Sequence, residues 1–137
     1  MNKQEQNTDK LEHIEYWKIS AGKSLTPAKH LFEAGDYVEC LFLAHLTLEK
    51  LLKAHWVKDN TGDVPPKIHN LHKLASQTQL KLIPEQIAFL QKMNTFQMEG
   101  RYPDYNFSLY QDFDEHKTKQ FLEEAENLYQ WLLSKLP

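Results

Sequence analysis

The segment Gly100-Arg101-Tyr102-Pro103-Asp104-Tyr105 combines an arginine, two tyrosines and an acid at a break between two helical patterns. The guanidinium of Arg101 has a fixed positive charge and a planar set of donors that suits phosphate or carboxylate. The rings of Tyr102 and Tyr105 can stack on a base, and loops on a rigid scaffold often carry function. We therefore predict a ligand-binding loop, with Arg101, Tyr102, Asp104 and Tyr105 as contacts to a nucleotide.

Three further polar residues are candidates for the same site. Glu49 and Lys53 interrupt a strongly apolar segment and are spaced i,i+4 in the order that favours an ion pair. Such a pair either lies on the helix surface or lines a polar pocket, and Arg101 has the structural alternative of pairing with Glu49. His69 lies three residues before His72, but two histidines fall short of a zinc site, so neither a metal nor a cofactor is predicted.

Other residues of reactive type are assigned to the core. His45 and His55 lie in the same apolar segment as Glu49 and are predicted to be core or interface histidines. Cys40 is the only cysteine, which excludes an internal disulfide, and its apolar neighbours favour a buried free thiol.

Five helical patterns and no convincing strand account for the elements that position these residues. Gly35 is expected to end the first helix, and Asp36 with Glu39 has the form of a capping box at the start of the second. Pro27 is expected to kink the first helix or to restart it with Thr26 as its cap. The expected helices run from Leu11 to Phe32, Tyr37 to Val57, Leu71 to Ala75, Pro84 to Gly100, and from Asp112 or Asp114 to Leu136.

Length and composition favour an all-α, up-and-down bundle of four to five helices in one domain. We expect residues 1–10 to form a flexible N-terminal segment and residues 11–137 to form the single helical domain of the 137-residue chain. A net charge of −3 and the lack of a Lys/Arg block argue against broad binding to duplex DNA. Without a signal-peptide core or an apolar run of membrane-spanning length, a cytoplasmic protein without membrane contact is expected.

Four motifs occur in a characteristic order between about residues 16 and 133, and in this the chain resembles the HEPN family, small helical-bundle proteins of prokaryotes and some eukaryotes. The resemblance implies a homodimeric bundle, often encoded beside a minimal nucleotidyltransferase and acting in a toxin–antitoxin or related two-component system. The motifs are Ala34-Gly35-Asp36-Tyr37, Leu48-Glu49-Lys50-Leu51-Leu52-Lys53-Ala54, His69-Asn70-Leu71-His72-Lys73-Leu74 and Gly100-Arg101-Tyr102-Pro103-Asp104.

Many members of that family are metal-independent ribonucleases, in which an arginine is followed after four to six residues by a histidine. Arg101 matches the arginine, but no histidine falls in this window, and the next one downstream is His116. Attack by a ribose 2′-hydroxyl needs a group that moves a proton near neutral pH, which an arginine cannot do. The resemblance therefore implies a site that holds a phosphate but lacks the usual base.

We therefore expect a non-catalytic, dimeric HEPN module that binds a nucleotide, RNA or a nucleotidyltransferase partner. Two alternatives stay open. One is a metal-independent ribonuclease with an altered site, in which Arg101 stabilises the transition state and Asp104, His69 or a residue of a second subunit moves the proton. The other is a purely structural dimer, in which the loop at Arg101 only closes the fold.

Overall fold

The computed structural model describes residues 3–97 and 108–137, and every regular element in these two ranges is a helix. The prediction of an all-α bundle is thereby confirmed. The short helix after the undescribed residues was not expected from the sequence. The elements are α1 (Lys3–Glu33), α2 (Tyr37–Asp59), α3 (Leu71–Ala75), α4 (Pro84–Met93), a 3₁₀ turn η1 (Asn94–Phe96), α5 (Ser108–Asp112) and α6 (Glu115–Ser134).

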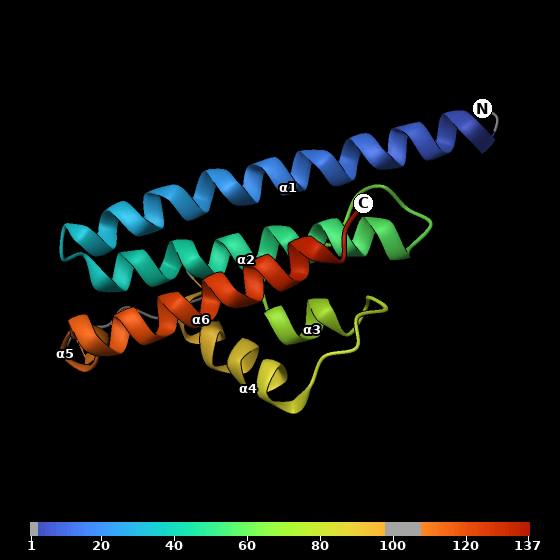
Figure 1. Cartoon of the computed structure of the whole chain (residues 1–137). Helices are drawn as coiled ribbons and strands as arrows, with labels where there is room; N and C mark the ends of the chain where they lie inside the picture. Colours follow the sequence, from blue (N-terminus) through green and yellow to red (C-terminus); the bar gives the residue numbers. More distant parts are fainter. Residues whose placement is uncertain (1–2, 98–107) are drawn as a thin grey trace.

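Helix α2 lies at the centre of the bundle (Figure 1). The long helices α1 and α2 lie antiparallel along one another, and α6 packs against α2 from the other side, with α3 and α4 beyond it. Most of α2 is consequently buried, as its almost continuous apolar composition predicts. Its buried side chains include Cys40, whose pKa burial raises to about 12, so it is a core thiol as predicted.

Helix α1 differs from the sequence-based expectation in two ways. It runs without interruption across Pro27, because that residue lies on the exposed face while Leu25 and Ala28 on either side of it are buried. The predicted restart with Thr26 as the cap is therefore wrong. Residues 3–10, assigned above to a flexible terminal segment, belong to α1.

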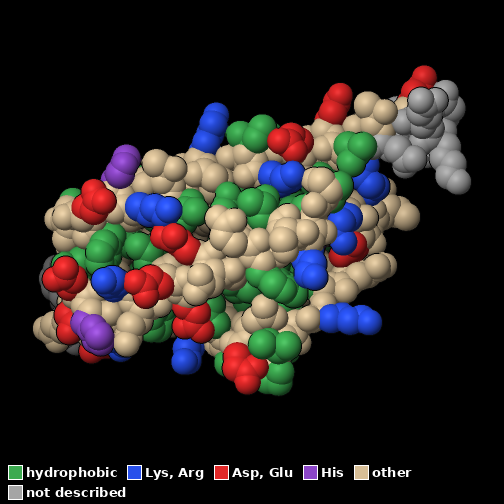
Figure 2. Space-filling view, viewed as in Figure 1, with side chains coloured by type: hydrophobic (Ala, Val, Ile, Leu, Met, Phe, Trp, Pro, Cys, Tyr) green, Lys and Arg blue, Asp and Glu red, His purple; other side chains and the backbone are tan. Residues whose placement is uncertain are grey.

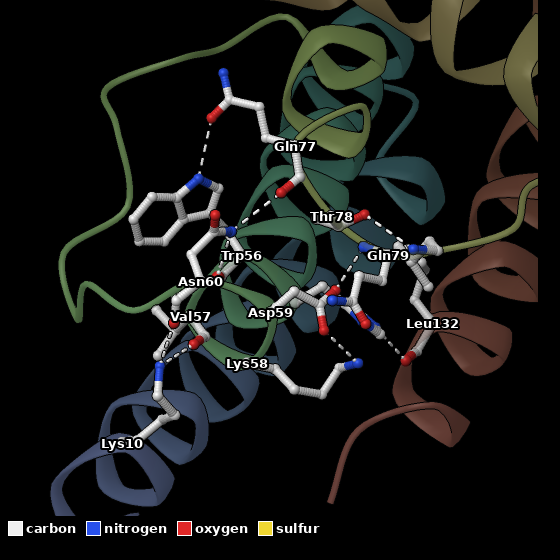
Figure 3. A network of polar contacts seen from close by, with 12 residues as sticks. Lys10, Trp56, Val57, Lys58, Asp59, Asn60, Gln77, Thr78, Gln79 and Leu132 are labelled. Carbon is white, nitrogen blue, oxygen red and sulfur yellow. Dashed lines mark hydrogen bonds and ion pairs between the residues drawn. The ribbon is translucent and has the colours of Figure 1, made fainter. Parts of the chain in front are cut away.

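The end of α2 is tied to three other parts of the chain (Figure 3). Lys10 Nζ of α1 donates hydrogen bonds to the carbonyl oxygens of Val57 and Asn60. The backbone N–H of Gln79 donates to Asp59 Oδ2 at 2.7 Å, and His55 Nε2 bonds the Leu132 carbonyl of α6 at 2.8 Å. These contacts satisfy carbonyl groups that helix ends leave without partners, and they explain why the helical domain includes α1 from before residue 11.

The turn between α1 and α2 has the predicted break but not the predicted cap. Gly35 has a φ of +84°, and Asp36 N–H donates to the Leu31 carbonyl, which gives a helix end that requires a left-handed residue. Asp36 occupies the N-cap position of α2, but its side chain makes no capping hydrogen bond. Glu39 instead accepts a hydrogen bond from the Tyr110 hydroxyl, so the predicted capping box is absent.

The later helices follow their predicted starts more closely than their predicted ends. Asp114 caps α6 by accepting from the Lys117 N–H at 2.8 Å. Asn70 caps α3 in the same way, as predicted. Helix α4 ends at Met93 and not near Gly100, because the chain turns into η1 at Asn94. None of the helices in the described ranges is long and apolar enough to cross a membrane.

Candidate functional site

Helix α2 places three polar side chains on its inner surface at intervals of four residues. His45, Glu49 and Lys53 follow one another at one-turn spacing, so they share a face of the helix. All three are buried, with 3%, 4% and 8% of their surface exposed. Ionised and polar groups at such depth need partners, which makes their contacts informative.

Glu49 lies between two nitrogen groups, one on each carboxylate oxygen. Lys53 Nζ lies 3.1 Å from Oε2, and His69 Nδ1 lies 3.0 Å from Oε1. The same ammonium lies 5.5 Å from the centre of the Trp17 ring of α1. The predicted i,i+4 pair is thus a buried pair that continues to His69, and the three sequence candidates Glu49, Lys53 and His69 form one network.

The backbone before α3 is what brings His69 to α2. Asn94 of η1 accepts from the Leu71 N–H at 2.8 Å and donates to the Asn70 side chain at 3.1 Å. These bonds fix the start of α3 two residues after His69. The sequence motif predicted the cap at Asn70, but nothing in it indicated that Asn94, 24 positions later, completes the support.

A cavity of about 210 Å³ lies beside this network. His45, Glu49 and His69 form its polar wall, while Phe42 of α2 and Phe96 of η1 form part of its apolar wall. The two phenyl rings lie edge to face with their centres 6.1 Å apart. The remaining lining residues are Leu43, Leu46 and Gln97.

His45 differs from the satisfied core histidine that the sequence favoured. Burial lowers the pKa of His45, an effect that Glu49, the His69 backbone and the Asn94 side chain oppose, so the ring is neutral near pH 7. Within the part of the chain that the structure describes, its Nε2 is buried and has no hydrogen-bond partner. An unmet buried nitrogen at the wall of a cavity is a group that a ligand can satisfy.

A family model described as the HEPN domain matches residues 14–136. The chain belongs to the HEPN domain family. The match covers all the helices from α1 to α6, and it agrees with the resemblance that the four sequence motifs carry. Comparisons with curated proteins and with solved structures found no match.

The remaining sequence candidates of this HEPN chain are Arg101, Tyr102, Asp104 and Tyr105, and all four lie outside the described residues. They follow Gln97, which lines the cavity, in the sequence. No group of three or more His, Cys, Asp or Glu side chains in residues 3–97 and 108–137 is placed to hold a metal ion. The aromatic wall formed by Phe42 and Phe96 was missed, because both appear in the sequence as ordinary core positions.

Proposed function

We propose that this chain is a non-catalytic HEPN module that binds a nucleotide or the end of an RNA chain. The observation that carries the proposal is the Glu49–Lys53–His69 network at the wall of a cavity that Gln97 also lines. Arg101 follows Gln97 by four positions and supplies a guanidinium suited to phosphate. The sequence after Arg101 lacks the histidine that family ribonucleases use, which favours binding over cleavage.

The test is a binding titration of the full chain with nucleotides and short RNAs. We expect Arg101→Ala to weaken binding by roughly tenfold or more, because charge-assisted hydrogen bonds contribute about 1.5–3 kcal/mol. Lys92→Ala, which removes one positive charge from an exposed position of α4, is the matched control and should bind like the wild-type chain. If neither nucleotides nor RNA nor a co-encoded nucleotidyltransferase binds, the proposal fails.

One observation favours a second function, a metal-independent ribonuclease with an altered site. The Glu49 carboxylate fixes His69 through Nδ1 at 3.0 Å, and a carboxylate in this position orients a histidine as a proton-transfer group. Cleavage of RNA in the presence of a chelator, lost in both Arg101→Ala and His69→Gln with the fold retained, would establish this function. Binding without cleavage would support the non-catalytic module.

Dimerisation through the long helices completes the proposal. At 100° per residue, Leu11, Tyr16 and Ile19 lie on the side of α1 opposite the core positions Ile14 and Ala21. Each of the three has more than half of its surface exposed. Figure 2 shows hydrophobic side chains among charged ones over α1. An apolar outer stripe of this kind suits the surface of a second copy, and the dimer in turn would serve a nucleotidyltransferase-associated, toxin–antitoxin-like system.

A further inference from the structure

The cavity between α2 and η1, bounded by Phe42, His45, Glu49, His69 and Phe96, has the size of a subsite for one ring system. Its volume of about 210 Å³ is below the 300–1,000 Å³ of pockets that enclose a whole drug-sized ligand. It also equals about seven times the 30 Å³ that a water molecule occupies in the liquid. A single planar ring system therefore fits, while a sugar and a phosphate would have to remain outside.

The walls of the cavity divide into a stacking part and a hydrogen-bonding part. Phe42 and Phe96 present aromatic surface, and Leu43 and Leu46 add aliphatic surface. Stacking on an aromatic side chain accepts any base, because every base has a π-face. A purely apolar guest would fit these walls but would leave the polar wall unsatisfied.

The polar wall asks for a guest that donates a hydrogen bond. His45 is neutral, and its buried Nε2 has no partner among the described residues. The Glu49 carboxylate beside it accepts from Lys53 and His69, and an ionised carboxylate is an acceptor only. Acceptors dominate this wall, so a ring that carries an N–H donor complements it.

We infer that this cavity holds the base of the bound nucleotide, stacked near Phe42 and Phe96 and donating an N–H hydrogen bond to His45 Nε2. The inference rests on the proposed function and deepens it, because it assigns the base and the phosphate of one ligand to different parts of the protein. It also predicts that the base, and not only the phosphate charge, contributes to affinity.

The experiment compares the four nucleoside monophosphates with ribose 5-phosphate, which has the same sugar and phosphate but no base. At least one of the nucleotides should bind the full chain roughly tenfold more tightly than ribose 5-phosphate, the size of effect that base stacking gives. Leu46→Trp, which fills the cavity, and His45→Phe, which removes the acceptor, should each reduce this difference without weakening ribose 5-phosphate. His30→Phe, on an exposed position of α1, is the control for His45→Phe.

A measurement on the wild-type chain covers the case in which the variants fail to fold. The imidazole resonances of His45 should shift in NMR spectra on addition of a nucleotide and stay unchanged with ribose 5-phosphate. Equal binding of both compounds, lost in Arg101→Ala, would overturn the base subsite while leaving the proposed function standing. Binding of neither compound would overturn the proposed function and the base subsite together.

Discussion

Glu49 shows how the position of a residue in the fold changes the meaning of its sequence spacing. On an exposed helix, an i,i+4 pair of Glu and Lys contributes only a few tenths of a kcal/mol. Here the side chains of Glu49 and Lys53 are 6% and 10% exposed, and removing one partner would leave a buried, uncompensated charge. The sequence gave the pair but not its depth, because burial depends on α1 and α6, which pack on α2 from elsewhere in the chain.

The two buried histidines predict the pH dependence of stability at the same scale. Burial lowers the pKa values of His45 and His55 below the ordinary value of 6.5, so the unfolded chain binds more protons than the folded one in acid. Their contribution is therefore fully present above pH 6.5 and is lost as pH falls below it. We expect the free energy of unfolding from urea titrations to fall between pH 7.5 and 5.5, by up to about 1.4 kcal/mol per pH unit for each histidine.

A variant separates this effect from general acid sensitivity. His55→Gln keeps a donor for the Leu132 carbonyl but cannot take up a proton, so its stability should change less with pH than that of the wild-type chain. His116→Gln, at an exposed position of α6, is the control. Equal slopes for His55→Gln and the wild-type chain between pH 7.5 and 5.5 would contradict the assignment.

At the scale of elements, glycine has opposite roles in two places. Gly35 ends α1 with a φ of +84°, and a Cβ at this position would meet no atom within 4 Å, so substitution has a conformational cost only. We expect Gly35→Ala to lower the free energy of unfolding by about 1 kcal/mol, because L-residues disfavour positive φ. Urea denaturation of the variant measures this loss.

Gly22 supplies the matched control for that prediction. It lies inside α1, where a Cβ would make an ordinary contact of 3.6 Å with the Tyr129 hydroxyl. Gly22→Ala should therefore raise the free energy of unfolding by about 0.5–1 kcal/mol, the usual gain for alanine over glycine in a helix. Stabilisation by both substitutions would show that the turn does not depend on glycine.

For the whole molecule, the testable property is the proposed dimer. We expect the chain to elute at twice its mass of 16.2 kDa, and Ile19→Glu to shift it toward the monomer by placing a charge in the exposed stripe of α1. Gln120→Glu adds the same charge at an exposed position of α6 and should leave the elution volume unchanged. A monomer across working concentrations in the wild-type chain would contradict the proposal.

The sequence by itself determined the helices, because apolar spacing, glycine and capping residues act within one or two turns of the chain. It indicated α2 as the central helix, the break at Gly35 and the caps at Asn70 and Asp114. It mispredicted Pro27, where packing of α1 on α2 outweighs the loss of one hydrogen bond.

The tertiary structure alone decided the site. His69 reaches Glu49 across 20 positions, and Phe96 reaches Phe42 across a larger separation, because Asn94 fixes α3 and η1 against the central helix. Such contacts join helices that are distant in sequence, and no local period encodes them. The acidic and basic residues of the second and third motifs were visible in the sequence, but only the packing of the helices made them one polar wall beside an aromatic cavity.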